Sequence, residues 1–325
     1  MTLPALMKAA RVTHYGGPDA VVIEEVPLPQ PGPGEVLVRV RAAPVTAGDA
    51  RMRSGKVPRG FGLPLRLAIG WRRPRNRPGW AYAGEVAALG AGVDHLQPGQ
   101  RVFGITGFKG GAQAEYLVCK AEGQILPLPD SLSFEEGAAF FFGGLTAVEF
   151  LLDKAGLAAG ETLLVNGATG SVGSAALQLA RHVGARVTAV ASADNLALAR
   201  GLGAAEVIDY RSQRIAGQFD VVLDVIGSLQ WPKARPYLAP KGRLVMITAD
   251  LLATLSAGLF PRRGKHRVIA GTNSEARAQM ERLVGLHQAG AYRPVLGQCL
   301  PFADLARAHA IAETFHKPGN LVVVM

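Results

Sequence analysis

A short apolar run, a glycine-rich turn and a helix of small residues follow one another, and no other feature constrains this chain as strongly. The run and the turn read Leu-Leu-Val-Asn-Gly-Ala-Thr-Gly-Ser-Val-Gly over residues 163–173. In such a unit the first glycine permits a tight turn, the second lets the backbone approach a pyrophosphate, and the third lets helix and strand pack closely. The helix N-terminus offers unpaired N–H groups to the same anion. The residues expected to hold a dinucleotide are therefore Gly167, Gly170, Ser171, Val172 and Gly173.

Strand and helix patterns alternate around this motif. We predict strands at 162–166, 186–191, 206–208, 220–224 and 242–247. We predict helices at 171–183, 194–202 and 230–238. Because helices between strands favour a parallel sheet covered on both faces, the pattern indicates a doubly wound α/β domain. This character begins near residue 131, where Ser131 to Glu136 are typical of a helix start with a serine cap.

The first 125 or so residues have a different, β-rich character. Short predicted strands at 21–26, 35–42, 83–89 and 101–105 are separated by glycine and proline. Such spacing is typical of a small barrel. Further on we predict helices near 275–289 and 303–314 and a strand at 320–325.

Composition limits the classes of protein that fit. Hydrophobic residues make up 49% of the 325 positions and charged residues 18%, which supports a sizeable core. The net charge of +10 is compatible with nucleic acid, an anionic membrane or a polyanionic cofactor. Cys119 and Cys299 cannot form a disulfide framework, which fits a reducing compartment. We expect a cytoplasmic protein with no signal peptide and no membrane-spanning segment.

Several separated motifs, taken in order, resemble the medium-chain dehydrogenase/reductase superfamily, and most closely its zinc-free, quinone-oxidoreductase-like branch. They are Pro-Gly-Pro-Gly-Glu-Val-Leu-Val at 31–38, Gln-Pro-Gly-Gln-Arg-Val-Phe-Gly at 97–104, Ala-Glu-Tyr at 114–116, Gly-Leu-Thr-Ala at 144–147, the glycine turn, and Val-Ile-Asp-Tyr at 207–210. The resemblance implies a GroES-like β-barrel domain over 1–125 and 288–325, with a Rossmann domain over 126–287 inserted between. It also implies a homodimer. The glycine turn departs from the family slightly, since Gly167 stands where alanine is common.

The ligands of a catalytic zinc are missing where zinc-binding relatives have them. Those relatives use a Cys after a barrel strand, a Gly-His-Glu motif, and a later Cys or His. Residues 45–49 of this chain contain no Cys, and residues 79–85 contain no His-Glu pair. Because zinc needs about three protein ligands, we expect no catalytic zinc.

The end of the second predicted strand bears on the choice of nicotinamide cofactor. Proteins that prefer NAD place a carboxylate there, whereas this chain has Ala191 and Ser192. Ser192 can donate to a 2′-phosphate, and the resemblance adds Tyr210, with Arg211 as a counter-charge. We therefore expect NADPH, although Asp194 would support NADH unless it caps the next helix.

The resemblance places the active cleft between the two domains. It suggests Thr46 as a hydrogen-bonding partner of the nicotinamide ribose or the substrate, and Thr146 as a neighbour of the nicotinamide. Arg51 would stabilise a developing enolate, with a salt-bridged surface residue as the alternative. Tyr82 would be a phenol donor in the cleft, with packing under the barrel as the alternative.

These expectations combine into one function and two alternatives. The chain is expected to be a zinc-independent, NADPH-dependent oxidoreductase that transfers hydride to a quinone or an α,β-unsaturated carbonyl, with protonation from solvent. One alternative is a carbonyl or alcohol dehydrogenase of the same superfamily. The other is a basic nucleic-acid-binding protein with NADPH as a ligand, which the absence of a recognisable binding module disfavours.

Overall fold

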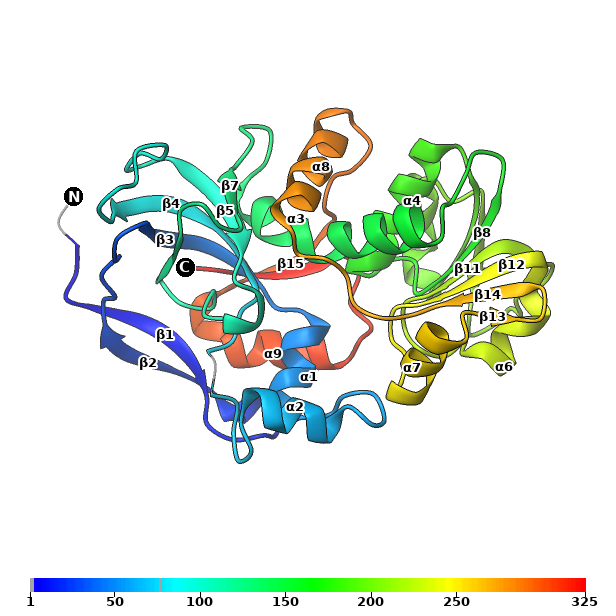
Figure 1. Ribbon diagram of the computed structural model, residues 1–325, viewed down its shortest axis with the longest axis horizontal. Coiled ribbons are helices and arrows are strands. Elements are labelled where there is room, and N and C mark those ends of the chain that lie inside the picture. Colours follow the sequence, from blue (N-terminus) through cyan, green and yellow to red (C-terminus); the bar gives the residue numbers. More distant parts are fainter. Residues whose placement is uncertain (1–2, 76) are drawn as a thin grey trace.

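The computed structural model describes residues 3–75 and 77–325. Two seven-stranded sheets form the framework of the protein. Figure 1 shows the first sheet, with β3, β4 and β5, at one end and the second, with β8, β11, β12 and β14, at the other. Helix α3 (Phe134–Ala147) lies between them. No helix among the described residues has the length and apolar character needed to cross a membrane.

The first sheet joins segments from far apart in the sequence. Its order is β15-β16-β3-β4-β5-β7, and β6 also pairs with β3. These strands are β3 (Glu35–Pro44), β4 (Ala81–Leu89), β5 (Arg101–Ile105), β6 (Tyr116–Lys120), β7 (Ile125–Pro127), β15 (Leu296–Pro301) and β16 (Asn320–Val324). A separate antiparallel pair comprises β1 (Leu6–Val12) and β2 (Val21–Pro27). Because β16 pairs with β3, early and late parts of the chain build one sheet, as the resemblance implies.

The second sheet is parallel except for its short last strand. Its order is β10-β9-β8-β11-β12-β14-β13. The strands are β8 (Thr162–Asn166), β9 (Arg186–Ala191), β10 (Glu206–Asp209), β11 (Phe219–Asp224), β12 (Leu238–Met246), β13 (Arg262–Arg263) and β14 (His266–Ile269). The strand order runs outward in both directions from β8. In sheets of this kind the ligand-binding crevice is expected beyond the carboxyl end of that strand.

Helices cover both sheets. The remaining helices are α1 (Ala47–Ser54), α2 (Gly62–Ile69), α4 (Ser171–Val183), α5 (Leu196–Gly201), α6 (Trp231–Ala234), α7 (Leu251–Leu259), α8 (Arg277–Gln288) and α9 (Leu305–Glu313). Helix α3 begins at a capping box in which Ser133 and Glu136 satisfy each other's backbone N–H groups. Within α3, a Cβ on Gly143 would lie 2.2 Å from the Ser171 carbonyl oxygen, so only glycine allows α3 to approach α4 this closely.

The five strands predicted for the second sheet are confirmed, but the helix predicted at 230–238 is too long. It consists of α6 followed by a single 3₁₀ turn, and β12 begins at Leu238 rather than at 242. Pro236 lies in this stretch, and proline cannot donate the backbone hydrogen bond that would continue the helix. Leu238 is buried in the core, which favours the strand.

Residues 46–51 form the N-cap and first turns of a helix. Thr46 is the N-cap of α1, and its hydroxyl accepts from the Asp49 N–H while the Asp49 carboxylate accepts from the Thr46 N–H. Gly55, with a φ of 69°, ends the helix in the left-handed conformation. The Thr-x-x-Asp spacing and the later glycine were sequence signals for this helix.

Candidate active site

The three glycines of the turn differ in what the protein itself demands of them. Gly167 has a φ of +88°, a conformation that favours glycine. A Cβ on Gly173 would lie 2.2 Å from the Gly167 carbonyl oxygen, so glycine is required for close packing. Gly170 has a φ of −75°, which any residue adopts, and a Cβ there would meet nothing within 4 Å. The space beside Gly170, at the N-terminus of α4, therefore contains no atoms of the described protein.

A segment just before β16 forms one side of this open space. The Gly319 N–H donates to the Thr169 carbonyl oxygen over 2.7 Å, and Ser171 Oγ donates to the Gly319 carbonyl oxygen over 3.3 Å. Lys317 Nζ donates to the same carbonyl oxygen over 3.1 Å. Burial lowers the pKa of the Lys317 ammonium to about 8. Lys317 has no carboxylate partner among the described residues, and sequence reasoning missed it because only its position before the last strand marks it.

Ser192, Tyr210 and Arg211 come together at the far end of the crevice. Strands β9 and β10 are neighbours, and the Tyr210 N–H donates to the Ala191 carbonyl oxygen at the end of β9. The guanidinium of Arg211 lies 5.6 Å from the centre of the Tyr210 ring. The side chain of Asn195 donates to Ser192 Oγ over 2.9 Å.

The alternative in which Asp194 caps the next helix is wrong. Asp194 lies inside the short 3₁₀ helix Ala193–Asn195, and the N-cap of α5 is Asn195. The Asp194 side chain is exposed and is not used as a helix cap, so it is the residue that would support NADH.

Arg51 reaches from α1 to the wall of the crevice formed by the second sheet. Its Nη2 donates to Thr248 Oγ1 over 3.5 Å, and its guanidinium lies 5.3 Å from the centre of the Phe315 ring. Thr248 Oγ1 in turn donates to the carbonyl oxygen of Val225, just beyond β11. Burial lowers the pKa of Arg51. No carboxylate pairs with Arg51 in residues 3–75 and 77–325, so the salt-bridged alternative is not observed there.

The loop beyond β11 is held by a buried carboxylate. Asp224 accepts from Asn166 Nδ2 over 2.8 Å and from the backbone N–H groups of Gly227 and Leu229. Burial raises the pKa of this carboxyl, although the hydrogen bonds from Asn166 and the backbone oppose the shift. The loop lies against the glycine turn, since a Cβ on Gly167 would come within 2.7 Å of Ile226. These contacts fix the floor of the crevice next to the turn.

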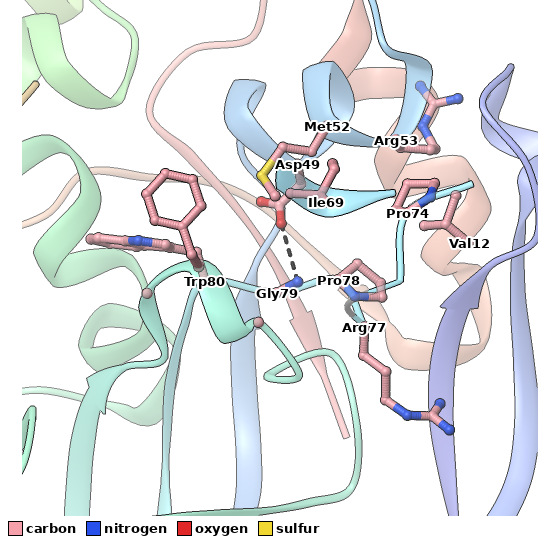
Figure 2. Close-up of a pocket in the computed structure, with 13 residues that line it drawn as sticks. Val12, Asp49, Met52, Arg53, Ile69, Pro74, Arg77, Pro78, Gly79 and Trp80 are labelled. Carbon is pink, nitrogen blue, oxygen red and sulfur yellow. Dashed lines mark hydrogen bonds between the residues drawn. The ribbon is translucent and has the colours of Figure 1, made fainter. Parts of the chain in front are cut away.

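The hydroxyl hydrogen of Thr46 is used within the first turn of α1 rather than directed at a ligand. Its hydroxyl donates to Asp49 Oδ2 over 2.6 Å. The other carboxylate oxygen, Asp49 Oδ1, accepts from the Gly79 N–H over 3.2 Å (Figure 2). Burial raises the pKa of Asp49, and these hydrogen bonds oppose the shift. Asp49 thus joins the two segments, 45–49 and 79–85, in which zinc-binding relatives carry ligands.

The side chains that meet at this junction are aromatic. The rings of Trp80 and Phe142 meet edge to face, with centroids 5.8 Å apart and planes at 81°. A Cβ on Gly48 would lie 3.8 Å from the Phe142 ring and 3.3 Å from Thr46 Oγ1, which places all three residues together. Thr146 Oγ1 donates to the Phe142 carbonyl oxygen one turn earlier in α3, so Thr146 lies close by. Within the described residues, no group of three or more His, Cys, Asp or Glu side chains is arranged to hold a metal ion.

A mainly apolar pocket adjoins this junction, between α1, the end of α2, Pro74 and residues 77–80 (Figure 2). Met52, Ile69 and Trp80 contribute side chains to its lining, and Asp49 reaches its edge. Such a pocket suits an apolar molecule better than a charged one.

Tyr82 does not face the cleft. Its side chain is completely buried in the core of the first sheet, and its hydroxyl lies 3.2 Å from Cys119 Sγ. Burial raises the pKa of Tyr82 well above its ordinary value and raises the pKa of Cys119 to about 11. The packing alternative is therefore correct. Both faces of β4 are buried at this point, since Tyr82 lies in one core cluster and Ala81 and Ala83 lie in another.

We expect Tyr82→Phe to leave turnover unchanged, because the lost hydroxyl contacts only the core. The substitution removes one buried hydrogen bond and should lower the free energy of unfolding by about 1 kcal/mol. Urea unfolding and steady-state kinetics of the variant check both statements. A large fall in kcat with unchanged stability would show that the Tyr82 hydroxyl takes part in turnover.

The fold and the crevice define a dinucleotide-dependent oxidoreductase with a barrel domain and a Rossmann-like sheet domain. Residues 32–130 match the family described as alcohol dehydrogenase GroES-like domain, and residues 202–323 match the family described as zinc-binding dehydrogenase. The chain belongs to the medium-chain dehydrogenase/reductase superfamily, in its quinone-oxidoreductase-like branch.

Individual relatives agree with this placement over nearly their whole length. A quinone oxidoreductase of Pseudomonas aeruginosa is 32% identical over 98% of this chain and 100% of its own. The structure of the quinone oxidoreductase from Coxiella burnetii superposes with a TM-score of 0.86, at 26% identity over 98% of this chain and 99% of that one. A mycobacterial protein in complex with NADPH superposes with a TM-score of 0.78, at 27% identity over 98% of this chain and 100% of that one.

Proposed function

We propose that the protein is a zinc-independent, NADPH-dependent reductase of quinones or α,β-unsaturated carbonyls. The observation that carries the proposal is the open space above Gly170, at the N-terminus of α4 and at the point where the strand order of the sheet diverges. Helix N-termini at such points bind pyrophosphate through backbone N–H groups. Relatives with printed names of quinone oxidoreductase support the acceptor class.

The proposed cofactor contacts follow the crevice from one end to the other. The backbone of Gly167, Gly170, Ser171, Val172 and Gly173 would hold the pyrophosphate, and Thr146 would border the nicotinamide. Ser192, Tyr210 and Arg211 would receive the 2′-phosphate of NADPH. The exposed hydroxyl and guanidinium groups at that end support NADPH over NADH, because a carboxylate in place of Ser192 would repel the phosphate.

The bound nicotinamide supplies the hydride, so the chain's own residues need to position the acceptor and stabilise charge. Arg51 lies at the crevice with no carboxylate partner among the described residues and would stabilise the oxyanion that forms on the acceptor. Its guanidinium does not release a proton near neutral pH, so the product's proton would come from solvent. The apolar pocket beside Trp80 has a cavity volume of only about 40 Å³, so it would receive one edge of the acceptor, and the acceptor's body would lie outside it against the rings of Trp80 and Phe142.

The zinc-dependent alternative fits the donor set poorly. At the junction where zinc-binding relatives hold their metal, this chain presents the Thr46 hydroxyl, the Trp80 indole and the Phe142 ring. The Asp49 carboxylate also lies there, but both of its oxygens already accept hydrogen bonds, from Thr46 and from the Gly79 N–H. Borderline-soft Zn²⁺ prefers thiolate, imidazole and carboxylate ligands. Hydride transfer to a plain ketone also needs a proton donor or a Lewis acid at the carbonyl oxygen, and Arg51 supplies neither. Metal analysis of the purified protein and activity in the presence of a chelator test this directly.

Calorimetric titration with NADPH and NADH, followed by NADPH oxidation with a panel of quinones and enones, tests the proposal. We expect tighter binding of NADPH and turnover with at least one acceptor class. A preference for NADH would indicate that the cofactor is NADH and that Asp194 contributes to its binding. Failure of both nucleotides to bind would overturn the proposal, and a salt-sensitive gel shift would then favour the nucleic-acid-binding alternative.

Lys317→Met should weaken NADPH binding about tenfold at pH 7, because the Lys317 ammonium shares the Gly319 carbonyl oxygen with Ser171 at the proposed pyrophosphate site. In the wild type, affinity should fall as pH rises through about 8, where Lys317 loses its proton. Titrations between pH 6.5 and 9.5 measure this. The same pH dependence in Lys317→Met would contradict the assignment.

Folding stability should depend on Lys317 with the opposite sign. The pKa of Lys317 is lower in the folded protein than its ordinary value of 10.5, so the unfolded chain binds more protons between pH 8 and 10.5. The contribution of Lys317 to stability therefore rises with pH over that window, and Lys317→Met should remove this rise. The stability profile separates a folding effect from a binding effect.

We also propose a homodimer in the cytoplasm. Helix α7 exposes Leu252, Leu255 and Leu259 beside the edge strand β13, an apolar surface of the kind that interfaces cover. Cys119 and Cys299 are both free thiols, which fits a reducing compartment. Light scattering that gives a mass near 34.1 kDa would contradict the dimer.

A further inference from the structure

The indole of Trp80 donates a hydrogen bond to a residue far away in the sequence. Trp80 Nε1 donates to Glu275 Oε1 over 2.8 Å. Glu275 lies between β14 and α8, and its carbonyl oxygen accepts from Gln124 Nε2 over 2.5 Å, so its backbone is held independently of its side chain. Burial raises the pKa of the Glu275 carboxyl, and the Trp80 hydrogen bond opposes the shift. The catalytic steps derived above make no use of Glu275.

The ring of the same indole forms a corner with the Phe142 ring. The two rings meet edge to face, which is a preferred geometry for aromatic pairs. Phe142 precedes Gly143, whose close approach to Ser171 ties this part of α3 to the glycine turn. The corner therefore lies beside the proposed pyrophosphate site, and Trp80 also lines the apolar pocket.

We propose that Glu275 is a positioning residue that locks Trp80 against Phe142, and that the fixed aromatic corner selects flat, conjugated ring acceptors over small aliphatic enones. The inference rests on the proposed function, since it assigns the pocket beside Trp80 to the acceptor. It adds a substrate preference and a residue that sets it.

The physical reason is that a hydrogen bond at one end of the indole fixes its orientation. Without an acceptor at Glu275, the half-buried Trp80 N–H would seek another partner, and the ring would rotate away from Phe142. A planar ring system gains contact with a fixed aromatic wall, whereas a short aliphatic enone covers too little of it to benefit. Loss of the hydrogen bond between Glu275 and Trp80 should therefore change the KM of the two acceptor classes differently.

Glu275→Leu and Glu275→Gln form a matched pair for the test. Leucine removes the hydrogen-bond acceptor at similar size, whereas glutamine keeps a carbonyl oxygen that can accept from Trp80. Both variants are assayed with a naphthoquinone and with but-3-en-2-one, alongside the Kd of NADPH. We expect Glu275→Leu to raise KM for the quinone about three- to tenfold, with kcat, KM for the enone and the NADPH Kd unchanged. Glu275→Gln should restore the wild-type KM.

A double-mutant cycle with Trp80→Phe completes the design. Phenylalanine keeps an aromatic ring but lacks the N–H, so Glu275→Leu should have no further effect on KM in that background. Equal changes with both acceptors, or a full effect of Glu275→Leu in Trp80→Phe, would overturn the inference. Such results would leave the proposed function intact, because NADPH binding and enone turnover of the wild type report on that separately.

Discussion

Gly170→Ala is expected to lose most NADPH affinity while it keeps its fold. The added Cβ meets no protein atom within 4 Å, so it would occupy only the space assigned to the pyrophosphate. Displacing the pyrophosphate from two charge-assisted hydrogen bonds, at about 1.5 kcal/mol each, corresponds to about a 100-fold weaker Kd. The cost to folding should be about 1 kcal/mol, because alanine is a poorer N-cap than glycine. Calorimetric titration and urea unfolding measure the two effects.

Two further glycine variants separate an effect on NADPH affinity from an effect on folding stability. Gly173→Ala places a Cβ 2.2 Å from the Gly167 carbonyl oxygen and should cost about 3 kcal/mol of stability as well as cofactor affinity. Gly285→Ala, in α8, meets nothing within 4 Å and should stabilise the helix by about 1 kcal/mol without changing NADPH binding. Unchanged NADPH affinity in Gly170→Ala would remove the central argument for the cofactor site.

Arg51→Met is expected to lower kcat about 100-fold, the range found when a single oxyanion donor is removed. Methionine keeps an apolar stem against Phe315 but removes the charge. The Kd of NADPH should change little, because Arg51 is assigned to the acceptor rather than to the cofactor. Single-turnover and steady-state kinetics with one quinone measure the effect.

Thr248→Val provides the control for Arg51. Valine has a similar shape but removes the oxygen that accepts from Arg51 Nη2. If the charge of Arg51 matters and its exact partner does not, this variant should lose at most about tenfold in kcat. A kcat of Arg51→Met equal to that of the wild type would mean that Arg51 only links the two domains.

The local structure around the proposed cofactor site was predictable from sequence because it lies within short segments of the chain. The turn from Gly167 to Gly173 lies within one strand–turn–helix unit, and helix α4 begins and ends as predicted, at Ser171 and Val183. Ser192 and Tyr210 end neighbouring parallel strands, so sequence spacing alone brings them together. Local patterns of this kind depend little on the rest of the fold.

The acceptor half was predicted less well because its contacts are long-range. The partner of Trp80 is Glu275, 195 residues away, and Thr248 is 197 residues from Arg51. Lys317 reaches the turn only because Gly319 pairs with Gly170. The hydroxyl of Tyr82 resembles that of a cleft donor, whereas both faces of β4 are buried at this point and its side chain lies in the core. Nothing in the neighbouring sequence of these residues encodes such partners.

The contact between Ser171 and Gly319 also has a consequence for the order of events during synthesis. The two residues are 148 positions apart, and β16, directly after Gly319, pairs with β3 near the other end of the described chain. The ribosome must therefore release the segment around Gly319 before either the nucleotide crevice or the first sheet is complete. A nascent chain that stops short of Gly319 is therefore expected to bind the nucleotide weakly and to leave one edge of β3 without β16 as its partner.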